Sequence, residues 1–223
     1  ILFLVAFLLW LLNRPYHGLW HDAYVYGVIS AQWIYPDALA SDLFFRFGSQ
    51  GSLTIFTPIY GELVRALGLN NAAQLVVLSG GVLWTTGLFL LARAMLSNAS
   101  GDTIAMRFAL LFGVILSFSY SPNRGIFVLN ENFATARSWA MPLGLMAVAL
   151  QLYGRWLTAT GLALLSFLLH PLLGIWPLVL IVADRISLSR LLPLVILPAL
   201  VVLFIGSQGG LDFPRLHLIS GAL

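Results

Sequence analysis

Apolar stretches long enough to form helices alternate with polar loops along this chain. Residues 1–12 predict the second half of a helix that ends at Asn13-Arg14-Pro15. Four further apolar stretches predict helices at residues 72–96, 103–120, 140–153 and 191–205. Apolar runs of roughly 20 residues are typical of helices that cross a membrane. The pattern therefore predicts a polytopic membrane protein.

The longest polar interruption, residues 13–70, contains two amphipathic segments. In the first, residues 22–35, the apolar side chains Tyr26, Ile29 and Trp33 recur at spacings of three and four. This spacing places them on one face of a helix. Proline follows at once and ends the segment.

The second amphipathic segment is expected to start near Thr57-Pro58, a capping residue followed by proline at the first helical position. Its predicted apolar stripe consists of Ile59, Leu63 and Leu67. Gly68 is expected to end it. Because the loop is rich in tryptophan, tyrosine and phenylalanine, we expect both helices to lie in the membrane interface.

The apolar stretch 157–183 is broken by His170-Pro171 and Pro177. We interpret it as two short helices that meet at His170-Pro171, with a single kinked span as the alternative. Positive residues favour the cytoplasmic side of a membrane. With two helices, the cytoplasmic loops contain Arg93, Arg107, Arg155, Arg185 and Arg190. The two-helix interpretation gives about seven spans and places the 13–70 and 121–139 loops together on the external face.

The composition of the chain agrees with a membrane protein. The chain is 60% hydrophobic and 9% charged, with a mean hydropathy of +0.96, whereas soluble domains are about 25% charged. Backbone polar groups in lipid must be paired within their own segment, so the predicted fold is an all-α membrane helix bundle. We expect one transmembrane module over residues 1–223, truncated at both ends.

The charge and the cysteine content of the chain exclude several kinds of site. The chain has no cysteine, so it cannot form a disulfide or a thiolate metal site. Its net charge of +3 is spread over the loops and forms no basic block for nucleic acid. Four of its eight acidic residues lie in the 13–70 loop: Asp22, Asp37, Asp42 and Glu62.

Asp22 is the first candidate for chemistry because it follows the first span at the start of a predicted interfacial helix. A carboxylate there can act as a general base toward an acceptor that arrives from water. His21, its neighbour, belongs to a residue type that titrates near neutral pH. The structural alternative is that Asp22 only caps the helix and interacts with its dipole.

The layout of this region resembles the GT-C superfamily of membrane glycosyltransferases, closest to its protein-mannosyltransferase and aminoarabinose-transferase members. The resemblance rests on a first span, the acid at His21-Asp22 before a tyrosine-rich helix, a second acid at Asp42, and a proline-containing helix. It extends over most of the chain. Where the family commonly has Asp-Glu, this chain has His-Asp, and Leu-His-Pro replaces a Thr-Lys-Gly-Pro-like turn.

The resemblance implies that Asp22 is the catalytic base and that Asp42 is a second acid that orients the acceptor. Asp42 is also a candidate for a divalent metal site, which would need His21 or Glu62 as further ligands. Gln50 and Glu62 are candidates for contacting the substrate.

The second external loop provides candidates for the donor phosphate. Arg124 and Arg137 have guanidinium groups that match phosphate oxygens, and the alternative for each is contact with lipid headgroups. Glu131 lies between them and is expected to contact substrate or to pair with one of them. His170 is expected to make a structural hydrogen bond at the helix–helix turn.

The resemblance implies a sugar transfer from a polyprenyl-phosphate donor to an acceptor, on the periplasmic face of a bacterial inner membrane. The alternative is a non-catalytic membrane subunit that binds lipids and partner subunits. A transporter is disfavoured because the spans at 72–96 and 103–120 contain no acidic residue and no inverted repeat is visible.

Overall fold

A computed structural model of the chain describes residues 1–47, 50–96, 110, 113 and 131–185. The chain separates into two units, residues 1–181 and 182–223. In the second unit only residues 182–185, the last turn of a helix, are described. All candidate residues that the structure describes lie in the first unit.

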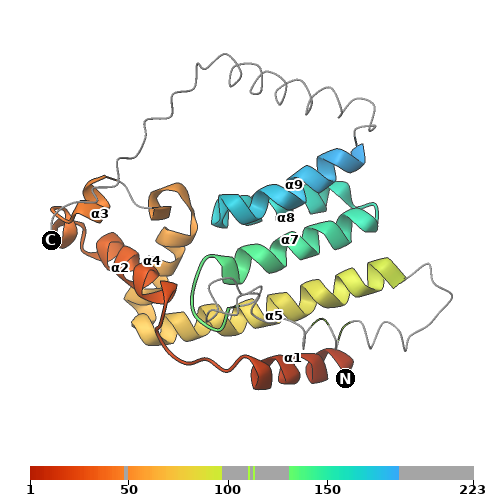
Figure 1. Cartoon of the computed structure of the whole chain (residues 1–223), viewed down its shortest axis with the longest axis horizontal. Helices are drawn as coiled ribbons and strands as arrows, with labels where there is room; N and C mark the ends of the chain where they lie inside the picture. Colours follow the sequence, from red (N-terminus) through yellow and green to blue (C-terminus); the bar gives the residue numbers. More distant parts are fainter. Residues whose placement is uncertain (48–49, 97–109, 111–112, 114–130, 186–223) are drawn as a thin grey trace, which may run out of the picture. The chain divides into compact units, whose positions relative to one another are not determined.

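The described residues are mostly helical and contain no strand, which confirms the all-α prediction (Figure 1). The α-helices are α1 (Leu2–Asn13), α2 (Asp22–Ile34), α3 (Leu43–Arg46), α4 (Phe56–Leu67), α5 (Leu69–Leu96), α7 (Arg137–Leu152), α8 (Trp156–Leu169) and α9 (Pro171–Arg185). Two short 3-10 helices, η1 (Pro36–Leu39) and η2 (Gln50–Leu53), lie in the first loop.

One helix in the described part of the chain, α5, is long and apolar enough to cross a membrane. At 28 residues it extends about 42 Å at 1.5 Å per residue, more than the roughly 30 Å of a hydrocarbon core. The apolar helices α1 and α8 are shorter. The expected helices at 103–120 and 191–205 lie outside the described residues, so the number of spans stays a prediction.

Small residues let α5 approach its neighbours closely. A Cβ added at Gly80 would lie 2.8 Å from the backbone oxygen of Ser138, and one at Gly87 would lie 3.1 Å from that of Pro142. Both contacts are made with α7. On another side of α5, Gly81 lies against the buried indole ring of Trp10 from α1. Such positions are typical of tightly packed helices in membranes.

Helices α8 and α9 confirm the predicted break at His170-Pro171. The amide of His170 donates to the carbonyl of Ser166 (2.9 Å), which closes the last turn of α8. Proline at the next position begins α9, because proline is tolerated in a first helical turn. His170 Nδ1 accepts a long hydrogen bond from the amide of Leu173 (3.4 Å). This bond is the structural role expected for His170.

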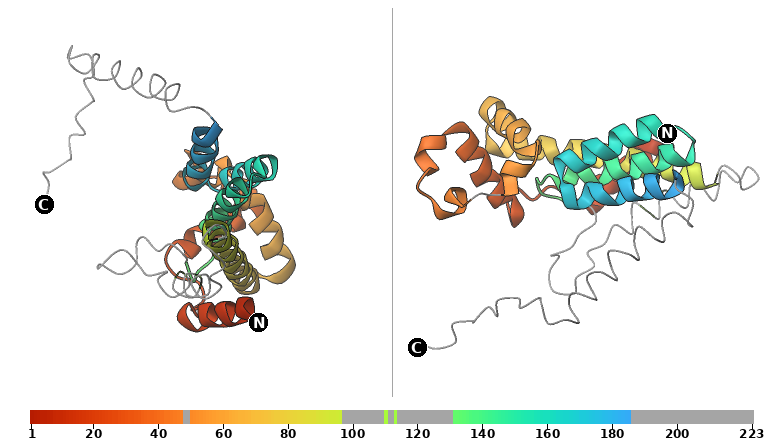
Figure 2. Two further views of the ribbon diagram at one scale, coloured as in Figure 1. Left: turned by 90° about the vertical axis from the view of Figure 1, so that its right-hand side faces the viewer. Right: turned by 90° about the horizontal axis from the view of Figure 1, so that it is seen from above.

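The first loop and the start of α7 meet at one end of the long helices. Figures 1 and 2 show α2 and α4 beside each other at the end where α5 and α7 begin. Asn132 donates to the carbonyl of Pro15 (3.1 Å), and Ile55 donates to the carbonyl of Leu168 at the end of α8 (3.0 Å). The predicted meeting of the two polar loops is therefore observed for their described parts.

The expected details of α4 need correction. The helix begins at Phe56 with no side-chain cap, and Thr57 is buried instead of capping the first turn. Of the predicted stripe, Ile59 and Leu67 are exposed, as the apolar face of a helix in the membrane interface would be, so the contact of this stripe with lipid stays a prediction. The aromatic rings of Phe56 and Tyr60, which stack with their centroids 5.3 Å apart, pack inward in their place.

Candidate functional site

Asp22 occupies the first turn of α2, where the sequence predicts a helix start. His21 precedes the helix, and its Nδ1 lies 2.9 Å from Oδ1 of Asp22. The Asp22 side chain is 36% exposed, so water can reach it. A carboxylate in the first turn also interacts favourably with the helix dipole.

A short segment before α7 supplies the other half of the site. The sequence predicts a polar loop there, yet residues 133–136 are buried. Glu131 is also buried, with 5% of its surface exposed, and it accepts a hydrogen bond from the hydroxyl of Thr135. Arg137 directly follows this segment and is the first residue of α7. The segment therefore places a carboxylate and a guanidinium next to each other at the start of the helix.

Arg137 joins the two halves. Its Nη2 lies 2.5 Å from Oδ2 of Asp22 and 2.7 Å from Oε1 of Glu131. Asp22 and Arg137 are 115 residues apart in the sequence, so the contact is made by the tertiary fold. We refer to His21, Asp22, Glu131 and Arg137 as the ion-pair cluster.

Burial and charge shift the pKa values of Glu131 and Arg137 in the ion-pair cluster. Burial raises the pKa of Glu131, although Arg137 and the Thr135 hydroxyl act in the opposite direction. For Arg137, burial alone would lower the pKa, but Glu131 and Asp22 together raise it. The guanidinium therefore stays charged, as expected for arginine, and its charge offsets that of the carboxylates beside it.

The backbone of His21 is strained. Its φ of 52° and ψ of −133° are unusual for a residue other than glycine. Such conformations cost about 1–3 kcal/mol and persist only where the surroundings impose them. Here the imidazole lies 5.6 Å from the ring of Phe133 and 6.0 Å from that of Trp20, measured between centroids. These rings and Asp22 hold the imidazole beside the carboxylate.

Two further residues border the ion-pair cluster. Tyr26, one turn after Asp22, is buried against the backbone of Ala136, and burial raises the pKa of its hydroxyl. His170, at the α8–α9 turn, is close enough for the charge of Arg137 to affect it: burial first, and Arg137 second, lower the pKa of His170. An imidazole in this position is therefore mostly neutral at neutral pH.

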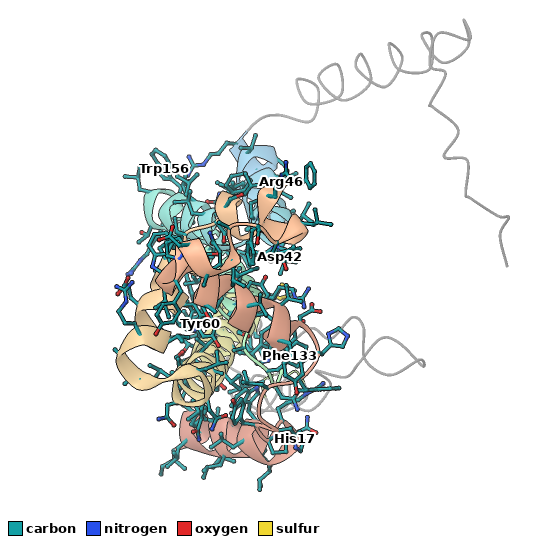
Figure 3. All side chains as sticks on the ribbon, turned by 90° about the vertical axis from the view of Figure 1, so that its left-hand side faces the viewer. His17, Asp42, Arg46, Tyr60, Phe133 and Trp156 are labelled. Atoms are coloured by element: carbon teal, nitrogen blue, oxygen red, sulfur yellow. The ribbon has the colours of Figure 1, made fainter. Side chains whose placement is uncertain are left out.

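Asp42, expected as the second acid, caps a short helix in the structure. Its Oδ1 accepts a hydrogen bond from the amide of Phe44 (2.8 Å), so the side chain caps α3. Figure 3 shows Asp42 apart from Phe133, which contacts His21. Asp42 makes no ion pair in the described part of the chain.

Glu62 also lies outside the ion-pair cluster. It pairs with Arg65 one turn later in α4, at 2.7 Å, and accepts a hydrogen bond from the indole nitrogen of Trp33 (3.1 Å). The side chain of Gln50 and the whole of Arg124 fall outside the described residues. Their expected contacts with substrate stay predictions.

No three histidine, aspartate or glutamate side chains of the described residues form a group that could hold a metal ion. The metal site considered for Asp22 and Asp42 with His21 or Glu62 is therefore not assembled in the described residues, because Asp22, Asp42 and Glu62 lie on or before three different helices. The arrangement of the ion-pair cluster is instead that of a carboxylate positioned by a cation and an imidazole.

The sequence identifies the four members of the ion-pair cluster as candidates but not the residues that support them. Phe133 and Thr135 belong to a segment that the sequence predicts as a polar loop, and Tyr26 is predicted only as part of an apolar face. A clue in the sequence is the short run Phe133-Ala134-Thr135-Ala136, whose small and apolar residues suit a buried segment.

Comparison of the chain with protein-family models, with curated proteins and with solved structures finds no match. The geometry of the ion-pair cluster is therefore the basis for a functional hypothesis.

Proposed function

We propose that this protein is a membrane-embedded glycosyltransferase that moves a sugar from a polyprenyl-phosphate donor to an acceptor on the external face of the membrane. The observation that carries the proposal is the contact between Asp22 and Arg137. It puts a water-accessible carboxylate beside a cation at the end of the helix bundle. General-base catalysis needs such a carboxylate, and a phosphate leaving group needs such a cation.

In the proposed reaction the acceptor hydroxyl transfers its proton to Asp22. The acceptor oxygen forms a bond to the anomeric carbon, and the bond from that carbon to the polyprenyl phosphate oxygen breaks. The electron pair of the broken bond stays on the phosphate. One displacement of this kind inverts the anomeric configuration. The proton then leaves Asp22 through water or the adjacent imidazole of His21.

Arg137 has two roles in this proposal. Its Nη2 holds Asp22 and Glu131, while its Nε–H is buried and has no partner in the described part of the chain. Guanidinium groups present five N–H donors, so donors remain for an oxygen of the departing phosphate. The neighbouring Glu131 holds the guanidinium in place.

The test compares Asp22→Asn with Asp37→Asn, which removes another acid of the same loop, in η1. Transfer from a polyprenyl-phosphate sugar should fall by about 100-fold or more in Asp22→Asn, a usual effect of losing a general base, and stay near wild type in Asp37→Asn. Unchanged turnover in a folded Asp22→Asn variant would contradict the role of Asp22.

A second candidate function is a non-catalytic membrane subunit. It is favoured because both oxygens of Asp22 are paired, Oδ1 with His21 and Oδ2 with Arg137. A purely structural contact between α2 and α7 would have this arrangement. In that case Asp22→Asn would lower the melting temperature and the yield of complexes with partner subunits, and no transfer would be measured for the wild type.

A further inference from the structure

A second candidate binding site lies between α2 and α4, apart from the ion-pair cluster. An open cleft of about 580 Å³ is lined by residues of α2, η1, η2 and α4 and by Thr54, which lies between η2 and α4. Its volume falls within the roughly 300–1,000 Å³ of small-molecule sites. Trp33, on its wall, is eleven residues after Asp22 in α2, or about 16 Å along the helix axis. The cleft therefore differs from the proposed transfer site.

Two threonine hydroxyls in the wall of the cleft have no hydrogen-bond partner among the described residues. Thr54 and Thr57 both line it, and the Oγ1 atom of each is buried without a hydrogen-bond partner in the described part of the chain. Thr57 is 7% exposed. Buried polar groups are nearly always paired, with protein, water or ligand. The two hydroxyls point to a polar molecule that binds in the cleft.

The charges in the cleft favour a neutral ligand. Glu62 and Arg65, both in the lining, form two hydrogen bonds with each other, at 2.7 and 2.8 Å. An anion would be repelled by the carboxylate, and a cation by the guanidinium. The mutual pairing leaves neither charge without a counterion.

The polar groups of the cleft call for a ligand that both donates and accepts hydrogen bonds. The hydroxyls of Thr54 and Thr57 and the side-chain amide of Gln32 can each do both. Trp33 supplies an apolar aromatic wall. Its indole N–H donates a hydrogen bond to Glu62, and its ring packs against Gly61. A sugar ring matches this combination, since it has hydroxyls on its edge and C–H groups on its faces.

We infer that the cleft between α2 and α4 binds a neutral sugar ring through Thr54, Thr57, Gln32 and Trp33. The inference does not depend on transfer at Asp22. The ring is either part of a soluble saccharide or the head group of a glycolipid, and both present the same chemistry to the cleft.

The test uses the full chain in nanodiscs free of sugar-based detergent. Saturation-transfer NMR with a panel of neutral methyl pyranosides should detect binding to the wild type. Thr57→Val and Thr54→Val each remove one hydroxyl at nearly constant volume and should weaken binding by roughly threefold to tenfold, as the loss of one hydrogen bond predicts. Thr86→Val, in α5, is the control because its hydroxyl bonds to its own helix at the carbonyl of Val82.

A second arm adds a neutral glucosyl diacylglycerol to the nanodiscs. Displacement of the methyl pyranosides by this lipid would assign the cleft to a glycolipid head group, and no displacement would assign it to a soluble saccharide. Absence of binding by every pyranoside and by the glycolipid would overturn the inference. Equal binding by wild type and both folded valine variants would overturn it too, as would displacement by inorganic phosphate or by a phosphatidylcholine head group.

Discussion

The guanidinium of Arg137 lies 2.5 Å from the carboxylate of Asp22 and joins the first turn of α7 to the first turn of α2. The same nitrogen of Arg137 also contacts Glu131, which is nearly completely buried. One cation thus serves two carboxylates with unequal access to water. In the proposed transfer the two acids therefore have separate roles: Asp22 meets the substrate, and Glu131 holds the arginine in place.

Removal of Arg137 should destabilise the fold. Arg137→Ala leaves Glu131 buried without a cation, and breaking a buried ion pair in this way costs about 3 kcal/mol. Denaturant unfolding measures the loss. Arg93→Ala, at the far end of α5, removes the same charge and should change stability by less than about 0.5 kcal/mol. The double variant Glu131→Gln/Arg137→Ala should recover part of the loss, and no recovery would exclude the proposed coupling.

Glu131 should make stability depend on pH. The folded state raises the pKa of Glu131 above its ordinary 4.5. Between pH 4.5 and the folded-state pKa, the folded protein therefore binds more protons than the unfolded chain. Its contribution to stability is complete below pH 4.5 and declines as the pH rises through the folded pKa. In thermal unfolding of Glu131→Gln, stability should no longer decline between pH 4.5 and the folded-state pKa of Glu131. Identical pH profiles for the wild type and the variant would refute this role of Glu131.

The packing of α1 on α5 should depend on Gly81. A Cβ there would overlap the ring of Trp10, so Gly81→Ala should cost about 1–3 kcal/mol, the usual effect of overpacking. Gly161→Ala in α8 is the control, since nothing lies within 4 Å of its added Cβ. It should be neutral or stabilise by up to about 1 kcal/mol through helix propensity. Equal effects of the two substitutions would mean that Trp10 does not pack on α5.

Asp42 should matter for local structure and not for transfer. Asp42→Ala removes the cap of α3 and should weaken protection of the Phe44 amide in hydrogen exchange by an amount that corresponds to about 1 kcal/mol. Asp42→Ser keeps a capping oxygen and should restore most of that protection. Loss of transfer in the serine variant would revive the expected role of Asp42 as a second catalytic acid.

Local patterns in the sequence predicted the all-α class and several helix bounds of the described part of the chain. The bounds of α2 and the break at His170-Pro171 follow from helical spacing and from proline, which act within a few residues. The stripe on α4 shows the limit of such patterns, because Ile59 and Leu67 satisfy the spacing but are exposed in the structure. Hydrophobic spacing identifies an apolar face without saying what covers it, and in a membrane protein lipid can do so.

The sequence identified the residues of the ion-pair cluster but not the contacts between them. Acidic and basic residues in two polar loops identified Asp22 and Arg137, but a sequence does not say which carboxylate each arginine will contact. The burial of Glu131 and the separation of Asp42 depend on how residues 131–136 pack in the fold. That packing is made by contacts between distant segments, such as Asn132 with Pro15.

Native mass spectrometry of the protein, in nanodiscs that contain a polyprenyl phosphate, tests the proposed function at its donor site. We expect a bound polyprenyl-phosphate species in the wild type and in Arg93→Ala. We expect its loss in Arg137→Ala, with Glu131→Gln/Arg137→Ala as the folded companion variant. Retention of that lipid by folded variants without Arg137, or its absence from the wild type alongside stable partner subunits, would contradict the proposed transfer.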